Sequence, residues 1–140
     1  MIRTFQAGDL EAVMSIWLSA NLEAHAFIDP EYWKRNFDAV TAMIPQAEVW
    51  VSEGGNGING FIGVVDDYIA GIFVDASARA AGVGSQLLDR AKQSRTSLRL
   101  SVYQKNEPAV AFYRRRGFQI DKESVDPETS EPEYTMIWNG

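Results

Sequence analysis

The hexapeptide Arg79-Ala80-Ala81-Gly82-Val83-Gly84 lies between an apolar run at 69–74 and an amphipathic run at 85–93. The apolar run is typical of a strand and the amphipathic run of a helix, so the glycines fall in the turn between them. Glycine permits positive φ angles and close backbone approach, and the first turn of the helix offers unpaired N–H groups. The stretch therefore predicts a concave anion site, built without a lysine, that suits a phosphate-bearing ligand such as a pyrophosphate.

The residues upstream of this stretch predict two helices. Asp9 is expected to cap the first helix, whose apolar residues recur at helical spacing up to Leu18. Residues 21–29 are expected to form a loop, and Pro30 suits the first turn of a second helix that ends near Met43. Two helices joined by a loop are therefore expected before the main group of strands.

Short apolar runs predict the strands of a sheet. The step from 68–74 through the helix to 98–103 is a β-α-β crossover, so these two strands are expected to be parallel. Asn56-Gly57 predicts a tight hairpin turn, and Asn106 is expected to cap a further helix that Gly117 ends. The expected class is mixed α/β (α+β), with a mostly antiparallel sheet of six to seven strands, a central parallel pair and helices on both faces. The predicted strands are 2–5, 47–53, 58–65, 68–74, 98–103, 118–123 and 134–138.

Composition excludes several kinds of site and partner. The 140 residues contain no cysteine and one histidine, which excludes disulfides, thiolate metal sites and multi-histidine sites, and no metal is expected. Nineteen acidic against thirteen basic side chains give a net charge of −6, which argues against nucleic acid. That charge is compatible with a cationic substrate and equally with an ordinary acidic surface. No apolar run approaches the roughly 18 residues of a membrane helix and the first residues lack a secretory signal, so no membrane partner and a cytoplasmic location are expected.

A Gly-x-Gly pattern is not specific by itself. A Rossmann dinucleotide site requires a third glycine where this chain has Leu87, and a Walker A loop requires a Gly-Lys-Ser/Thr that is missing. A second signal about thirty residues further on makes the pattern more specific. It comprises Asn106, Ala109, Phe112-Tyr113 and Gly117-Phe118.

Together, Arg79-x-x-Gly82-x-Gly84 and Asn106-x-x-Ala109-x-x-Phe112-Tyr113-x-x-x-Gly117-Phe118 resemble the GNAT superfamily of acetyl-CoA-dependent N-acetyltransferases. The predicted order of elements is similar to that fold over nearly the whole chain. The segments 102–106 and His25-x-Phe27-Ile28 look closer still to small bacterial acetyltransferases of the YiaC and YjaB kind. The resemblance implies a single GNAT domain over residues 1–140 in which the two parallel strands splay apart.

The resemblance also implies an activity. Acetyl-CoA would be the co-substrate and would give its acetyl group directly to a primary amine, since the absence of cysteine leaves no obvious covalent carrier. The preferred acceptor is a protein lysine or an N-terminal amine. A small-molecule amine (polyamine, amino acid or antibiotic) and a CoA-binding domain with little catalytic activity remain alternatives, and so do a monomer and a homodimer.

Roles for single residues follow from the resemblance. Main-chain amides at 81–85 would hold the pyrophosphate, and the pantetheine would pair near Phe73 and Val74, one of whose amides would stabilise the oxyanion. Asn106 would touch the pantetheine arm, and Tyr113 would be the general acid unless it is only a partly buried aromatic. The expected cofactor-binding residues are Phe73, Val74, Arg79, Ala81, Gly82, Val83, Gly84, Ser85, Asn106 and Tyr113.

The general base is left open by the sequence. Related enzymes often carry a glutamate where this chain has Ser101. His25 is the predicted second catalytic residue because its intrinsic pKa suits a base and its loop should border the acceptor, although a structural role is the alternative. A water-relayed base is the further possibility, together with Glu53, Asp66 and Asp67. Two roles are open for Arg114–Arg116: one of them approaches a phosphate of CoA, or all three only complement the dipole of their helix. Phe27 and Tyr32 are candidates for lining the acceptor pocket.

Overall fold

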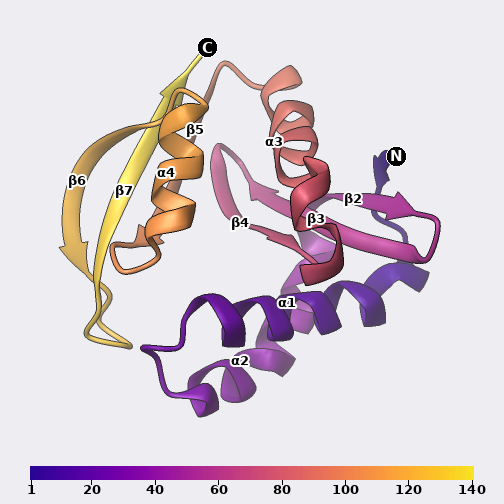
Figure 1. Cartoon of the computed structure of the whole chain (residues 1–140), viewed down its shortest axis with the longest axis horizontal. Helices are drawn as coiled ribbons and strands as arrows, with labels where there is room; N and C mark the ends of the chain where they lie inside the picture. Colours follow the sequence, from indigo (N-terminus) through magenta and orange to yellow (C-terminus); the bar gives the residue numbers. More distant parts are fainter.

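The computed structural model describes residues 1–79 and 81–140, and its elements follow the predicted order (Figure 1). Within those residues a seven-stranded sheet runs in the order β1-β2-β3-β4-β5-β7-β6. The mixed class with a mostly antiparallel sheet is therefore confirmed. The elements are β1 (Ile2–Thr4), η1 (Ala7–Asp9), α1 (Leu10–Ala24), α2 (Pro30–Met43), η2 (Ile44–Gln46), β2 (Glu48–Gly54), β3 (Gly57–Val65), β4 (Tyr68–Val74), η3 (Ala76–Ala81), α3 (Val83–Gln93), β5 (Ser97–Tyr103), α4 (Glu107–Arg115), β6 (Gln119–Val125) and β7 (Pro132–Asn139).

The parallel pair β4–β5 is the shortest junction of the sheet within the described residues. Its register holds at Tyr68↔Arg99 and Ile69↔Leu100, and beyond Ile69 the described residues of the two strands no longer pair. Figure 1 shows β4 and β5 diverging from this point. Because β4 stays paired with β3 as far as Val74, the divergence leaves one edge of β4 without a partner strand. The predicted parallel, splayed pair is therefore confirmed.

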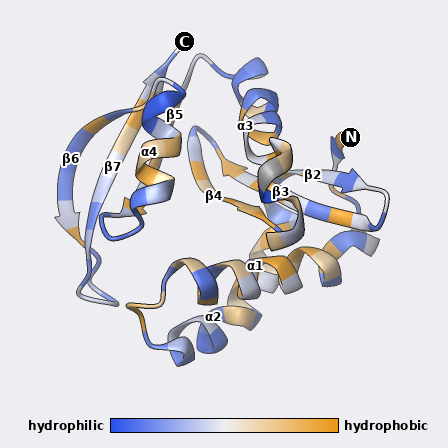
Figure 2. Cartoon of the chain, viewed as in Figure 1, coloured by the Kyte–Doolittle hydropathy of each residue, from blue (hydrophilic) through white to orange (hydrophobic). Residues whose placement is uncertain are grey.

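Helices cover both faces of the β1–β4 part of the sheet. Strand residues alternate between faces, so Trp50 and Ile62 pack with α3 while Val51 and Phe61 pack with α1 and α2. Figure 2 shows hydrophobic colour on α1 and on the central strands, whereas β6 is mostly hydrophilic. The buried strands thus form the core, and β6 is a polar edge.

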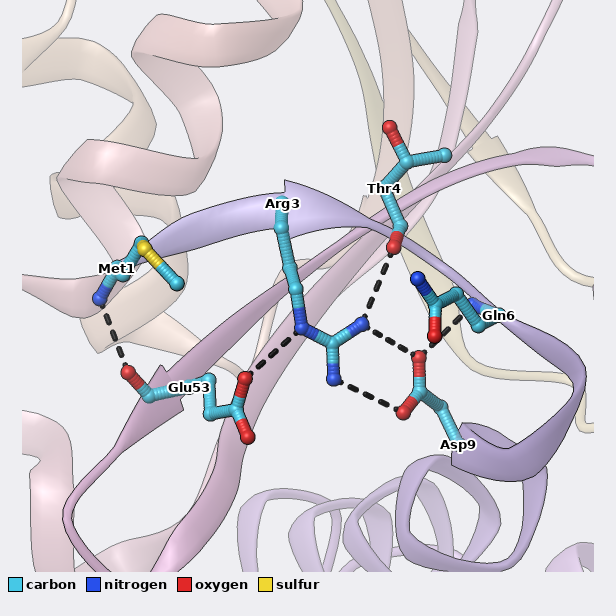
Figure 3. A network of polar contacts seen from close by, with 6 residues as sticks. All are labelled: Met1, Arg3, Thr4, Gln6, Asp9 and Glu53. Carbon is cyan, nitrogen blue, oxygen red and sulfur yellow. Dashed lines mark hydrogen bonds and ion pairs between the residues drawn. The ribbon is translucent and has the colours of Figure 1, made fainter.

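Asp9 occupies the N-cap position of α1, but its side chain makes no cap hydrogen bond there, so the predicted side-chain cap is wrong. Its carboxylate accepts hydrogen bonds from both terminal nitrogens of Arg3, at 2.9 and 3.0 Å, and from the amide of Gln6 at 2.8 Å (Figure 3). The Nε of Arg3 donates to Glu53 at 2.9 Å. A bidentate guanidinium–carboxylate pair is stronger than a neutral cap bond, which explains why the side chain turns to Arg3. The network fastens β1 to β2 and to the start of α1.

Two other local predictions need comment. The loop expected at 21–29 begins only after Ala24, because Asn21 is buried and donates to the carbonyl of Trp17, which keeps it in the helix. The caps around α4 are confirmed: the Asn106 side chain accepts from the amide of Ala109 at 3.4 Å, and Gly117 has a φ of 92°. Among the residues that the structure describes, no helix is long and apolar enough to cross a membrane.

Candidate functional site

A cleft of about 950 Å³ occupies the divergence between β4 and β5. Its walls are β4, the start of α3, the length of α4, the C-terminal end of β5, the start of β7, and the C-terminal half of α1 with the start of α2. Eight of the ten predicted donor-site residues line it. These are Phe73, Val74, Arg79, Gly82, Gly84, Ser85, Asn106 and Tyr113.

The two remaining donor-site residues, Ala81 and Val83, lie in the glycine turn but do not line the cleft. The side chain of Val83 is buried in the core under α3, so only its main chain is available to a ligand. Gly82 precedes α3 with a φ of 76°, the left-handed region that glycine favours, and no side chain caps the helix there. Gly84 allows close packing, because a Cβ there would lie 3.4 Å from the Phe112 ring. The first N–H groups of α3 are thus free of a side-chain cap at the edge of the cleft.

Two arginines flank this turn. Arg79 forms an ion pair with Glu23 of α1, and its Nε lies 3.4 Å from the carbonyl of Val74. Arg116 donates from Nε to the hydroxyl of Ser85 at 2.9 Å, and its guanidinium stacks 4.0 Å from the centre of the Phe112 ring. Of the predicted arginine cluster, Arg116 is therefore the residue held at the start of α3, next to the expected phosphate position.

Tyr113 lies on the α4 side of the cleft and is 8% exposed. Its ring packs edge-on against Phe112 and Phe118, with centroids 5.3 and 5.6 Å away. Burial, with a smaller effect from Tyr68, raises the pKa of its hydroxyl well above the usual range. The hydroxyl therefore stays protonated at neutral pH, which is the state that a proton donor requires.

His25 follows the last residue of α1 and joins the two sides of the cleft. Asn21 donates its amide N–H to Trp17, so its Oδ1 faces His25 Nδ1 at 3.1 Å. The other ring nitrogen, Nε2, lies 3.2 Å from the side-chain nitrogen of Asn106, whose oxygen caps α4. The partners assign the Nδ1–H tautomer, in which Nε2 accepts from Asn106. Burial lowers the pKa of His25 to about 4, so the ring is neutral at pH 7.

An aromatic cluster surrounds His25. The imidazole stacks on Trp33 with centroids 5.2 Å apart, and Phe27 and Tyr103 meet it edge-on at 5.7 and 5.2 Å. Tyr32 lines the cleft, as expected for the acceptor side, whereas Phe27 lies behind it in contact with His25 and Tyr103. The helix side of the cleft is therefore mainly aromatic.

The three carboxylates predicted as alternative bases do not line the cleft. Glu53 is bound by Arg3, and Asp67 accepts from Arg99 Nε at 3.0 Å. Asp66 lies with Asp67 in the turn between β3 and β4. None of the three therefore forms part of the cleft wall.

The carboxylates that do line the cleft are Glu23, Asp126 and Glu133. Asp126 accepts from the hydroxyl of Tyr103 at 2.7 Å, and burial together with Asp126 raises the pKa of Glu133 above its usual value. The neighbouring Glu128 accepts from the hydroxyl of Tyr32 at 2.8 Å, which fastens the β6–β7 turn to α2. Sequence reasoning missed Asp126, Glu128 and Glu133 because their position depends on β7 lying between β5 and β6. A cluster of acidic residues at 121–133 was the available signal.

Comparisons with known proteins agree with this architecture. Residues 45–120 match the model of the acetyltransferase (GNAT) domain. The chain is 34% identical to the peptidyl-lysine N-acetyltransferase YiaC of Escherichia coli K12, over 99% of this chain and 96% of YiaC. The solution structure of apo YjaB from E. coli has a TM-score of 0.87 at 28% identity, covering 100% of this chain and 97% of YjaB. A Bacillus anthracis protein solved in complex with acetyl coenzyme A has a TM-score of 0.62 at 25% identity, covering 67% of this chain and 62% of its own.

Proposed function

Because the chain belongs to the GNAT family of acetyltransferases, we propose that it transfers the acetyl group of acetyl-CoA directly to the side-chain amine of a protein lysine. The observation that carries the proposal is the cleft between β4 and β5, with the glycine turn and the protonated Tyr113 on its walls. The choice of lysine rests on the relatives YiaC and YjaB, which are both named peptidyl-lysine N-acetyltransferases. An N-terminal amine is the neighbouring possibility.

In this proposal the donor lies along β4. Beyond Ile69 the edge of β4 that faces β5 has no partner strand, so main-chain groups at Phe73 and Val74 are available to an extended ligand. The N–H groups at 81–85 would hold the pyrophosphate, with Arg116 as a nearby cation. Asn106 would complete the site at the pantetheine arm.

The chemistry then uses few groups of the protein. The amine nitrogen forms a bond to the acetyl carbon while an amide of Phe73 or Val74 stabilises the oxyanion. When the carbon–sulfur bond breaks, the Tyr113 hydroxyl donates its proton to the thiolate. Its raised pKa keeps that proton available at neutral pH.

For His25 we propose a positioning role in place of the predicted basic one. The lone pair of Nε2 faces an N–H of Asn106, and a pKa of about 4 makes the ring a weak proton acceptor. Through Asn106 the imidazole connects α1 to the start of α4, the helix that carries Tyr113. The single GNAT domain over 1–140, the cytoplasmic location and the choice between monomer and homodimer stay predictions.

A panel of acceptors tests the proposed function. The protein and acetyl-CoA are mixed with lysine peptides, with peptides whose lysines are blocked but whose N-termini are free, and with polyamines and amino acids. We expect CoA release and a mass increase of one acetyl group on the lysine peptides. Turnover restricted to small amines would establish the small-molecule alternative, and tight CoA binding without turnover would establish the binding domain.

A further inference from the structure

Glu133 is the second residue of β7 and lines the cleft. It lies beside Ser101, the position at which related enzymes often carry a glutamate. We propose that Glu133 is the general base, which accepts the proton of the attacking amine. The inference rests on the proposed function, since it assigns a catalytic residue to that same reaction. The supporting observations are the free state of its carboxylate, its place in the sheet and its surroundings.

Of the three carboxylates on the cleft wall, Glu133 alone lacks a strong partner within the described part of the chain. Glu23 is paired with Arg79. Asp126 accepts from Tyr103 at 2.7 Å on one oxygen and from the amide of Glu128 at 2.9 Å on the other. Glu133 accepts only a long bond of 3.4 Å, from the hydroxyl of Ser124 to Oε1. A base needs a free lone pair, and Oε2 of Glu133 retains one.

The register of the sheet places Glu133 next to Ser101. Tyr103 pairs with Glu133, and Ser101 pairs with Thr135. Directly opposed residues, and residues two apart on one strand, point to the same face, so Ser101 and Glu133 are diagonal neighbours about 7–8 Å apart in the backbone. Long side chains on diagonal neighbours come within reach of one another, so the Glu133 carboxylate serves the same face of the sheet as a side chain at 101. The carboxylate lost at Ser101 is therefore replaced from the adjacent strand.

This face of β5 and β7 lies opposite the one covered by α4. Leu100 and Val102 point into the core with α4, whereas Tyr103 meets His25 and Phe27 on the helix side of the cleft. Glu133 thus faces the side of the cleft that α1 and α2 line, where the proposed acceptor would bind. An amine bound there lies between the carboxylate and the open edge of β4.

The surroundings of Glu133 raise the pKa of its carboxyl group. Burial raises its pKa first, and the charge of Asp126 raises it further. Besides Asp126, the titratable groups that line the cleft with it are Tyr103 at the end of β5, Lys105, Tyr68, Arg79, Tyr113, Arg115 and Arg116, with Glu23, His25 and Tyr32 on the helix side. Lys105 is paired with Glu131 at 2.8 Å, which leaves Glu133 without a cationic partner. A carboxylate with a raised pKa is the better general base.

The proton and electron balance is complete with the groups already named. The amine lone pair forms the new nitrogen–carbon bond, and the carbon–sulfur pair leaves with the sulfur. Glu133 takes the proton released from nitrogen, and Tyr113 supplies the proton taken up by the thiolate. The two residues return to their starting states by exchange with solvent once the products leave.

The test is Glu133→Gln, which keeps the size of the side chain and removes its basicity. With a lysine peptide as acceptor, we expect kcat to fall about 100-fold or more while the KM for acetyl-CoA stays close to that of the wild type. We also expect the acidic limb of the pH–rate profile to disappear. Glu123→Gln is the matched control, because Glu123 is exposed on the adjacent strand β6 and should leave both quantities unchanged.

A second variant distinguishes loss of the base from loss of structure. Adding Ser101→Glu to Glu133→Gln returns a carboxylate to the position that related enzymes use, and it should restore a pH-dependent rate. Neutralising Glu133 also removes repulsion from Asp126, so the melting temperature should not fall. A Glu133→Gln variant with wild-type kcat and an intact acidic limb would overturn the assignment. Absence of turnover in the wild type with every lysine peptide would instead contradict the proposed function.

Discussion

The two parts of the sheet differ in how many of their faces are covered. Strands β2 and β3 of the β1–β4 part are buried on both faces, by α3 on one and by α1 and α2 on the other. In the β5–β7 part, β5 alternates between buried and more exposed residues, and β6 is almost entirely exposed. The first part is a scaffold that fixes the glycine turn. The second leaves a polar face that carries Tyr103, Asp126 and Glu133 to the cleft.

Few hydrogen bonds connect the two parts across the cleft, whereas on the side of α3 and α4 they share one apolar core. The strands join at the two pairs of β4 and β5. The His25–Asn106 and Tyr32–Glu128 hydrogen bonds connect the helices of the first part to the second. The comparison therefore predicts that changes within the first part affect stability, and that changes at the contacts between the parts affect catalysis.

The largest effect is expected for Tyr113→Phe, which removes the proposed proton donor from the second part. The turnover number should fall by about 100- to 10,000-fold while CoA affinity stays nearly unchanged, because the ring remains in place. Steady-state kinetics and CoA titration measure the two quantities. Tyr134→Phe, which changes a partly buried core tyrosine, is the control. An unaltered turnover number would remove Tyr113 from the mechanism.

The two parts should differ in how far loss of a side chain lowers the free energy of unfolding. Phe61→Ala in β3 empties a position that is 1% exposed, and should lower the free energy of unfolding by about 3–5 kcal/mol. Val125→Ala on the exposed edge of β6 should change it by less than about 0.5 kcal/mol. Urea denaturation of both variants measures the difference. Equal losses would contradict the view of the first part as the scaffold.

A smaller effect is expected when the connection between the parts is broken. His25→Ala removes the link to Asn106 and should lower kcat/KM by about 10-fold or more through misplacement of α4. Because His25 positions Asn106 in our proposal, the acidic limb of the pH–rate profile should persist and the KM for acetyl-CoA should rise. Loss of that limb with an unchanged KM would restore His25 as the base.

The smallest effect concerns pH and stability. The pKa of His25 is about 4 in the folded chain and about 6.5 when unfolded, so the unfolded chain binds more protons between these values. Stability therefore falls as pH drops from about 6.5 towards 4, by about 1–2 kcal/mol after allowance for the partial exposure of the ring. Thermal melts at pH 7 and pH 5 should show a smaller drop for His25→Gln than for the wild type. Identical drops would contradict a neutral, buried imidazole.

Local signals in the sequence predicted much of this molecule. The cap at Asn106 and the helix end at Gly117 each depend on residues close in sequence, and both predictions are confirmed. Asp9 failed because its partner, Arg3, competes from outside the helix. The cleft acids were missed for a related reason, since strand order brings Glu133 beside β5 and no local pattern encodes strand order. Contacts between residues far apart in the sequence therefore determine the position of Glu133, and local sequence patterns do not reveal such contacts.

The order of the sheet has a consequence for how the chain folds. Every strand of the β1–β4 part precedes every strand of the β5–β7 part in the sequence, and only the β4–β5 pair crosses between them. During synthesis the first four strands emerge together, so they can pair before β5 leaves the ribosome. The two parts then join late, through the short parallel contact and the apolar core that they share. Pulse-labelled hydrogen exchange during refolding should accordingly protect the amides of β2 and β3 before those of β5 and β7.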